Sequence, residues 1–334
     1  MDMKFIKKIL SIGYIVSAVS LMPVVGHADT GDFDIDRWYQ ILHNVQNRAI
    51  EMKISSHTIN EVIQPSSFIP SIIKNDKNQA EFKLTLDQYL GRMINQKRIA
   101  QGKKMRGVYP TLLSRVEKKY GVPPHVILAF WGLESNYGEY KARYKLSDAF
   151  LTLMYDGRRE TFFEKQLFAL MKMTDKSHME IAEIQGSWAG AMGHFQFIPT
   201  TLEQYGVDGN NDGKIDIINS VGDAMYSAGN YLSKLGWNKK ERIVREVILP
   251  ADFDKSVLDG KTKKSLAEWA AMGVTNPNGT PIPRADMVAG LVGDIVDDSV
   301  GRVFLTYPNF YRIKRWNNSN WYAIAVAMLS DELK

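Results

Sequence analysis

The sequence predicts a mainly α-helical protein with a small β-rich subdomain and an EF-hand-like loop. Three observations support this fold class. Apolar residues recur at spacings of three and four along much of the chain, as they do on one face of a helix. Between about residues 240 and 305, short apolar runs separated by turn residues replace that pattern, which is typical of strands. A series of oxygen-bearing side chains begins at Asp208, with a glycine at its sixth position.

Residues 121–138, which read GVPPHVILAFWGLESNYG, are predicted to form a buried helix. A proline pair suits its first turn, and Gly138 suits the left-handed conformation that ends a helix. Residues 126–133 carry no polar side chain, so this helix belongs in the interior. Glu134 lies in its last turn, where burial and the negative end of the helix dipole both favour the protonated carboxyl. Glu134 is therefore the candidate general acid, although a glutamate at a helix end can also be a solvated surface group.

Residues 1–28 have the pattern of a signal peptide. Three lysines precede an apolar run over residues 9–25, and small residues lie before Ala28. We expect cleavage after Ala28 and export to the periplasm, with an uncleaved anchor as the alternative. The chain has no cysteine, so we expect no disulfide, no lipidated cysteine and no stable membrane anchor.

Charge gives little information about partners. The chain has 42 Lys and Arg against 37 Asp and Glu, a net charge of +5. Residues 1–28 hold three lysines and one aspartate, which leaves +3 on the mature chain. This balance is too weak to favour nucleic acid as a partner.

The changes of pattern along the chain predict several structural parts. Short strands are expected at residues 243–249 and 279–283. We expect a signal peptide over residues 1–28 and an N-terminal helical lobe over 29–105. A catalytic core that contains Glu134 and a candidate calcium loop is expected over 106–239. A β-rich subdomain over 240–305 and a C-terminal segment over 306–334, which completes a substrate groove, are expected to follow.

The loop that begins at Asp208 has the register of an EF-hand calcium loop, in which oxygen ligands alternate and the seventh position uses its carbonyl. The twelfth position holds an asparagine in place of a bidentate glutamate, so we expect weak binding, with a Kd of roughly 10⁻⁴ to 10⁻³ M. We expect a structural Ca²⁺ and no organic cofactor; the alternative is a turn that holds no ion. The candidate ligands are Asp208, Asn210, Asp212, Lys214, Asp216 and Asn219.

Three further segments hold polar or aromatic groups suited to a substrate. The arginines at 158–159 either face solvent or line a groove, where guanidinium groups bind carboxylate or carbonyl oxygens. Residues 186–199 form a glycine-rich turn in which Ser187 and Gln196 could orient a substrate, or a tightly packed turn without that role. A serine nucleophile is disfavoured, because no histidine and aspartate arrangement accompanies it. Residues 315–322 are expected to form a surface loop whose aromatic rings and amides suit a sugar, although its second tryptophan could instead pack in the core.

Four ordered motifs resemble the lytic murein transglycosylase B family: GVPPHVILAFWGLESNYG, GSWAGAMGHFQFIPTTLEQYGVDGNNDG, GNYL and NFYRIKRWNNSNWYAIAV. The resemblance covers essentially the whole mature chain. It implies a lysozyme-like helical core, with Glu134 as the single catalytic acid and calcium in the loop at Asp208. It also implies groove positions that contact the substrate, namely Tyr155, Arg158, Arg159, Ser187, Gln196, Tyr231, Asn317 and Tyr322.

The same resemblance implies cleavage of the β-1,4 bond between N-acetylmuramic acid and N-acetylglucosamine in peptidoglycan, with formation of 1,6-anhydro ends. We expect a monomer that acts on glycan strands, with cell-wall remodelling proteins as further partners. The alternatives are an inactive, calcium-dependent peptidoglycan-binding protein and a hydrolytic muramidase. The chain departs from the family pattern at His194, Phe195 and Trp316, the last standing where tyrosine is frequent, and these changes are expected to reshape nearby subsites.

Overall fold

The computed structural model describes residues 33–64, 66–77, 84–140, 142–177, 180–296 and 299–334. The predicted signal peptide lies outside these residues. Among the described residues, no helix combines the length and the apolar character needed to cross a membrane.

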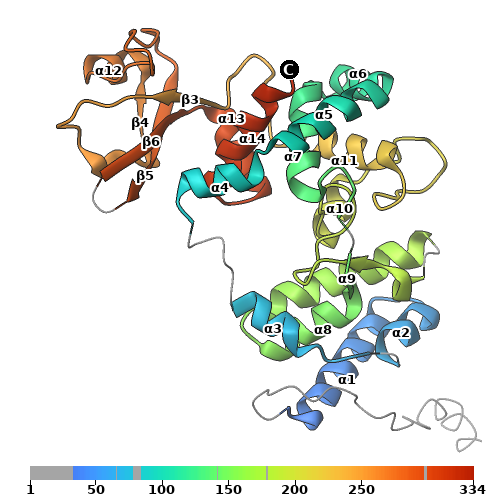
Figure 1. Cartoon of the computed structure of the whole chain (residues 1–334). Helices are drawn as coiled ribbons and strands as arrows, with labels where there is room; N and C mark the ends of the chain where they lie inside the picture. Colours follow the sequence, from blue (N-terminus) through green and yellow to red (C-terminus); the bar gives the residue numbers. More distant parts are fainter. Residues whose placement is uncertain (1–32, 65, 78–83, 141, 178–179, 297–298) are drawn as a thin grey trace, which may run out of the picture.

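Helices dominate the architecture, as predicted (Figure 1). The α-helices are α1 (Ile35–Glu51), α2 (Ser56–Ile63), α3 (Pro70–Lys77), α4 (Leu86–Met93), α5 (Gln96–Val108), α6 (Pro110–Tyr120), α7 (Pro124–Ser135), α8 (Leu146–Asp156), α9 (Glu160–Ser177), α10 (Pro199–Tyr205), α11 (Val221–Lys234), α12 (Leu266–Ala271), α13 (Pro308–Trp316) and α14 (Asn320–Glu332). The 3-10 turns are η2 (Ile181–Glu183) and η3 (Lys255–Val257).

Helix α7 is the buried helix that the apolar stretch predicts. It contacts α5, α6, α11 and α14, and the side chains of Val126 through Trp131 are all buried. It begins at Pro124, but it ends at Ser135, three residues before the predicted stop. At this end Asn136 adopts the left-handed conformation with φ 50°, and the Ser135 hydroxyl, which donates to the carbonyl of His194, accepts the amide of Gly138 at 2.9 Å.

The helices expected in one N-terminal lobe pack in two places (Figure 1). Helices α1 and α3 contact α8, and α2 contacts α9, in the lower part of the view. Helix α4 contacts α14, and α5 contacts α7, in the upper part. One hydrophobic core nevertheless extends from α1 to α14. The expected domain boundaries remain predictions.

A four-stranded antiparallel sheet lies beside this helical body, with the strand order β3-β6-β5-β4. A smaller sheet pairs β1 with β2, and the segment expected as a strand at 279–283 forms an isolated bridge at Pro281 instead. A separate hydrophobic cluster around Trp269 packs the large sheet against α12. The strands are β1 (Tyr144–Lys145), β2 (Gln185–Gly186), β3 (Val244–Val247), β4 (Asp259–Ser265), β5 (Val288–Val296) and β6 (Ser299–Thr306).

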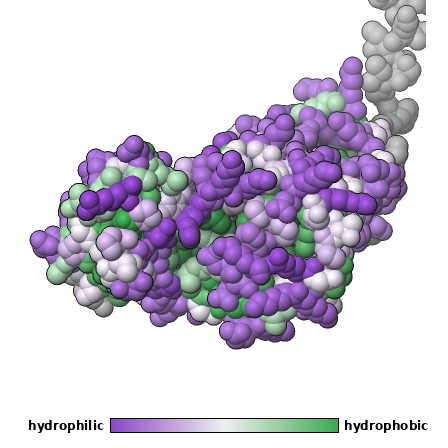
Figure 2. Space-filling view, turned by 90° about the horizontal axis from the view of Figure 1, so that it is seen from above, coloured by the Kyte–Doolittle hydropathy of each residue, from purple (hydrophilic) through white to green (hydrophobic). Residues whose placement is uncertain are grey.

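The face of the molecule drawn in Figure 2 is mainly hydrophilic. In Figure 2 hydrophilic residues cover most of the visible face, and hydrophobic residues show mainly in the recesses between them.

Candidate active site

Three helices bring their side chains together around the carboxyl group of Glu134. Glu134 is half-buried in the last turn of α7. The indole Nε1 of Trp316, the last residue of α13, donates a hydrogen bond to Glu134 Oε1 at 2.9 Å. The hydroxyl of Tyr322, in the first turn of α14, donates to the same oxygen at 2.5 Å. The pairing of two donors with one carboxyl oxygen is the central geometric feature of the site.

Tyr322 is well suited to remain a neutral donor. Its side chain is buried, and its ring lies 6.1 Å from that of Phe130. Burial raises the pKa of the Tyr322 phenol well above its ordinary value, and the charge and hydrogen bond of Glu134 act in the same direction. The phenol therefore keeps its proton and remains able to donate.

Aromatic rings surround Trp316 and connect it to Tyr231. The ring centroid of Trp316 lies 4.8 Å from Phe130, 5.2 Å from Phe197 and 5.0 Å from Tyr231. Tyr231 stacks on Tyr205 at 4.5 Å, and its hydroxyl donates to the carbonyl of Arg315 at 3.1 Å. Such faces suit stacking on sugar rings. The structure thus brings Glu134, Tyr231 and Tyr322 together around Trp316, and their substrate roles remain predictions.

The segment expected as a surface loop at 315–322 is mostly helical. Trp316 ends α13 and α14 begins at Asn320, so residues 317–319 alone connect the two helices. Asn317 is exposed in this connection, and its carbonyl accepts the amide of Ser319 at 2.8 Å. The helices form because Pro308 suits the first turn of α13 and the Ser319 hydroxyl caps α14, and they bury much of the aromatic surface that a loop would expose.

Ser187 and Gln196 lie in a tight turn between β2 and α10. The Ser187 hydroxyl accepts the amide of Ala191 at 3.0 Å, and the Gln196 amide donates to the carbonyl of Gly193 at 2.9 Å. Gln196 has φ 49°, a left-handed conformation that is uncommon outside glycine and often marks functional sites. Gly190 has φ 89°, and a Cβ there would lie 2.0 Å from the ring of Phe150. The small residues are therefore needed for packing, and the substrate roles of the two polar residues remain predictions.

His194 and Phe195, which depart from the family pattern, support the end of α7. Phe195 is fully buried and its ring is stacked with that of Trp131. The His194 ring accepts the indole N–H of Trp131 at 3.1 Å, and its carbonyl accepts the hydroxyl of Ser135 at 2.6 Å. Burial lowers the pKa of His194, which favours the neutral ring that this bond requires. Their expected effect on a subsite remains a prediction.

Tyr155, Arg158 and Arg159 have partners in the bundle of α1, α3 and α8. The Tyr155 hydroxyl accepts the amide of Asp34 at 2.8 Å. Both arginines form ion pairs with Asp76 of α3, whose side chain is 2% exposed, while the arginines are nearly half exposed. These contacts give the arginines a structural role, and their exposed surfaces leave the predicted substrate role open.

The loop between α10 and α11 has EF-hand-like turns that its own backbone stabilises. The Asp208 carboxylate accepts the amides of residues 211, 212 and 213. Gly213 has φ 88°, as a glycine at the sixth position of such a loop requires. Hydrogen bonds from Asn210 and from the amide of Lys214 hold the pKa of Asp212 below its usual range. Carboxylate oxygens have more than one lone pair, so these acids fit a calcium ion while they accept amides.

Asp223 is a residue of this loop that the sequence reasoning missed. Its carboxylate is fully buried in the first turn of α11. It accepts the amides of Gly209 at 2.9 Å, Asn210 at 3.2 Å and Asp216 at 2.8 Å. The signal available in the sequence was Ser220, which caps α11 three residues before Asp223.

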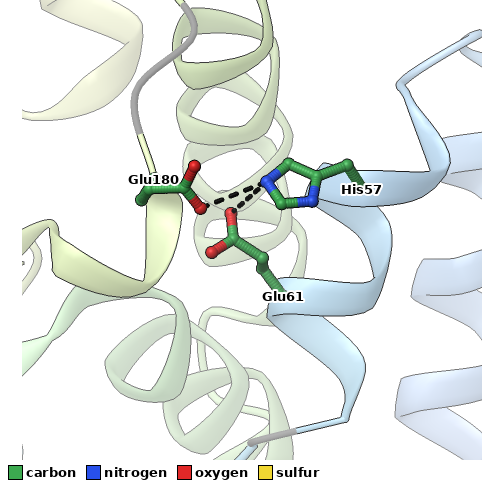
Figure 3. Close-up of side chains that lie close together, drawn as sticks. All are labelled: His57, Glu61 and Glu180. Atoms are coloured by element: carbon green, nitrogen blue, oxygen red, sulfur yellow. Dashed lines mark hydrogen bonds and ion pairs between the residues drawn. The ribbon is translucent and has the colours of Figure 1, made fainter.

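A second polar cluster lies at the contact between α2 and the turn η2 (Figure 3). His57 Nε2 lies 3.1 Å from Glu180 and 3.7 Å from Glu61, which is one helical turn further along α2. Glu61 also accepts the amide of Ile181 at 3.2 Å. The ligand atoms of all three side chains are within 4.8 Å of one another. These bonds fasten α2 to η2, and we assign the cluster a structural role.

Comparison with known proteins gives a consistent result. The family model described as the transglycosylase SLT domain matches residues 37–331. The membrane-bound lytic murein transglycosylase B of Escherichia coli (strain K12) is 31% identical over 254 residues, which is 72% of this chain. The match spans 65% of that relative, which is less than two thirds of its length.

Solved structures agree closely with the fold. SltB3 from Pseudomonas aeruginosa, in complex with NAG-anhNAM-pentapeptide, is 36% identical with a TM-score of 0.82, over 89% of this chain and 79% of that one. The Escherichia coli lytic transglycosylase SLT35, in complex with calcium, is 27% identical with a TM-score of 0.76, over 89% and 92% of the two chains. The family match includes α7, α13 and nearly all of α14, the helices that surround Glu134, and this chain belongs to the transglycosylase SLT domain family.

Proposed function

We propose that this protein is a lytic transglycosylase that cleaves the β-1,4 bond between N-acetylmuramic acid and N-acetylglucosamine in peptidoglycan. The observation that carries the proposal is the half-buried Glu134, whose Oε1 accepts hydrogen bonds from both Trp316 and Tyr322. The similarity to SltB3, whose structures hold NAG-anhNAM-pentapeptide and NAG-NAM-pentapeptide, supports the same class of substrate.

Glu134 acts first as an acid and then as a base. It protonates the bridging oxygen, and the bond from that oxygen to C1 of the muramic residue breaks. The substrate's 2-acetamido carbonyl stabilises the positive charge that develops at C1. The Glu134 carboxylate then removes the proton from the muramic O6 hydroxyl, and O6 bonds to C1 to close the 1,6-anhydro ring.

A single carboxyl group is sufficient for this reaction. Ordinary glycosidases use two carboxylates, about 5 to 9.5 Å apart, because one of them must attack C1 or activate water. Here the substrate supplies both the stabilising carbonyl and the attacking hydroxyl. The protein has to hold the sugar against one acid and keep water from C1.

The remaining predicted residues fit two parts of an extended groove. Ser187, Gln196, Tyr231, Asn317 and Tyr322 lie on the segments around α7, α10, α11 and α13–α14, and we assign them to the sugars nearest the cleaved bond. Tyr155, Arg158 and Arg159 lie at the α3–α8 contact, so they suit a more distant part of a long glycan strand. The exposed faces of the arginines suit carboxylate or carbonyl groups of the substrate.

We infer that the loop beginning at Asp208 holds a structural Ca²⁺. The side chains of Asp208, Asn210, Asp212 and Asp216 and the carbonyl of Lys214 would hold it, with Asn219 or the buried Asp223 beside them. The bound ion would supply positive charge to the loop that connects α10 and α11. A periplasmic location after removal of residues 1–28, a monomeric state and cell-wall remodelling partners complete the proposal.

Analysis of the products tests this function. The wild-type protein is incubated with purified peptidoglycan, and the soluble products are identified by mass spectrometry. Anhydromuropeptides support the proposal, whereas reducing ends would make the protein a hydrolytic muramidase. A protein that binds the glycan and releases nothing would be the inactive binding protein.

A further inference from the structure

We propose that Trp316 is a positioning residue that fixes the acidic proton of Glu134 on Oε2. The inference rests on the proposed function, because the place of this proton affects catalysis only if Glu134 is the acid. It starts from one observation: Trp316 and Tyr322 both reach Oε1, at 2.9 Å and 2.5 Å.

The chemistry of the indole group decides which oxygen carries the proton. An indole N–H can donate a hydrogen bond but cannot accept one. Oε1 therefore acts as the acceptor for Trp316, as the carbonyl oxygen of a protonated carboxyl group does. The Tyr322 hydroxyl then also donates to Oε1, and the acidic proton of Glu134 lies on Oε2. A phenol in place of the indole could reverse its role, so it would not impose this choice.

The surroundings of Trp316 keep its donor in place. Its ring is in contact with the rings of Phe130, Phe197 and Tyr231, with centroid distances of 4.8 to 5.2 Å. The backbone beside it is also held, because the carbonyl of Arg315 accepts the hydroxyl of Tyr231. Rotation of the indole away from Glu134 would disturb all of these contacts. The N–H is thus preorganised toward Oε1 before a substrate binds.

The same two donors serve both halves of the reaction. In the first half the Oε2–H bond breaks and the proton passes to the bridging oxygen, which leaves C1. The negative charge left on Glu134 strengthens the bonds from Trp316 and Tyr322. In the second half Oε2 takes the proton of the O6 hydroxyl as O6 bonds to C1, which restores the original state. Oε1 thus accepts from the two donors in both states, while Oε2 exchanges the proton with the substrate.

The main variant is Trp316→Phe, which removes the N–H and keeps an aromatic ring. In infrared difference spectra against Glu134→Gln, the C=O stretch of the protonated Glu134 should move to higher frequency, because its oxygen has lost a donor. The alkaline limb of the pH profile of kcat/KM should move upward by about one unit, since the carboxylate has lost a hydrogen bond. At the optimum, kcat should fall by about tenfold.

Two further variants separate this effect from a general loss of packing. Trp316→Tyr restores a donor to the Glu134 carboxylate and should return the alkaline limb toward the wild-type position, although its phenol can also accept and therefore does not fix the proton on Oε2. Trp237→Phe is the matched control, because the buried Trp237 indole N–H has no hydrogen-bond partner among the described residues. This control should change neither the C=O frequency nor the pH profile.

A neutron crystal structure of the wild-type protein tests the proton position directly. Deuterium on Oε2 supports the inference, and deuterium on Oε1 overturns it. An unchanged C=O frequency and alkaline limb in Trp316→Phe would also overturn it, even if the wild type forms anhydro products. If the wild type forms no such products but deuterium lies on Oε2, the proton assignment stands and the proposed function fails.

Discussion

Two hydrogen bonds to one oxygen distinguish Glu134 from a solvated glutamate at a helix end. The sequence placed Glu134 after an apolar run, which is consistent with either interpretation. Trp316 and Tyr322 are 182 and 188 residues away in the sequence, yet both donate to its Oε1. This arrangement holds the carboxyl group in a defined orientation, which a general acid requires.

The variant Glu134→Gln measures how much activity depends on this acid. An amide of the same shape cannot supply the proton, so the rate of product release should fall by about 10²- to 10⁴-fold. The folded state loses no packing, so the free energy of unfolding should remain the same or increase. Release of dye from labelled peptidoglycan and urea unfolding provide the two measurements. A variant that stays fully active would exclude Glu134 as the acid.

Protonation of His194 should contribute to acid sensitivity. Burial lowers its pKa below the ordinary value of 6.5, with Asp216 opposing the shift. The unfolded chain therefore binds this proton more tightly, so stability is fully present above pH 6.5 and decreases as the pH falls below it. We expect the free energy of unfolding of the wild type to fall between pH 7.5 and 5, and to fall less steeply in His194→Gln.

Urea unfolding across this pH range measures the difference between the two proteins. The glutamine side chain of this variant could still accept the Trp131 N–H through its amide oxygen, so the comparison isolates the titration. If the free energy of unfolding falls with pH equally steeply in the wild type and in His194→Gln, His194 makes no such contribution.

At the scale of elements, the turn after α7 connects this helix to the glycine-rich segment at 186–199. Ser135 is buried, donates to the carbonyl of His194 and accepts the amide of Gly138. A Cβ at Gly138, where φ is 86°, would lie 2.5 Å from the His194 ring. The turn after α7 therefore packs closely against His194, and this contact fixes the position of the last turn of α7.

Ser135→Ala tests the importance of this junction. The change leaves two backbone groups without their partner, so the free energy of unfolding should fall by about 1–3 kcal/mol. The activity should fall as well, because Glu134 precedes Ser135 directly. Ser256→Ala, at an exposed position, is the matched control and should change stability by less than about 0.5 kcal/mol. Equal effects of the two variants would argue against this role.

The elements show which features the sequence can predict. Local signals were sufficient for the start of α7 at Pro124 and for the strand expected at 243–249, which is β3, because proline and short apolar runs between turns act over a few residues. The predicted end of α7 was wrong, because the observed end depends on the hydrogen bonds of Ser135, one of which goes to His194, a residue distant in the sequence. The loop expected at 315–322 was also wrong, because packing against Phe130 favours helices there.

At the scale of the whole molecule, distant pairings decide how the site is built. The fold packs α14, from the C-terminal end of the chain, against α7, and Trp316 of α13 reaches Glu134 and Phe130 of α7. It also brings Asp76 of α3 to Arg158 and Arg159, which gives those arginines a partner that no local pattern indicated. Periodicity shows which face of a helix is buried, but it does not show which helix covers that face. Which residues form the site could therefore be learned only from the resemblance and from the structure.

Calcium should stabilise the molecule through the loop that begins at Asp208. With Ca²⁺ in 100-fold excess over Kd, the gain in the free energy of unfolding should be about 2.7 kcal/mol, seen as a rise in Tm. Mg²⁺ should give a smaller rise, because it requires a stricter octahedral geometry. Asp212→Asn removes one charged ligand and should reduce the calcium effect. A wild-type Tm that does not respond to Ca²⁺ would contradict the calcium assignment.

The central claim is that the substrate's own O6, rather than water, attacks C1. Digestion of peptidoglycan in water enriched in ¹⁸O, followed by mass spectrometry of the products, tests this most directly. The account predicts anhydromuropeptides without label from the wild type, and almost none from Glu134→Gln. Muropeptides that carry ¹⁸O at C1 would show that water attacks, and they would contradict the transglycosylase mechanism.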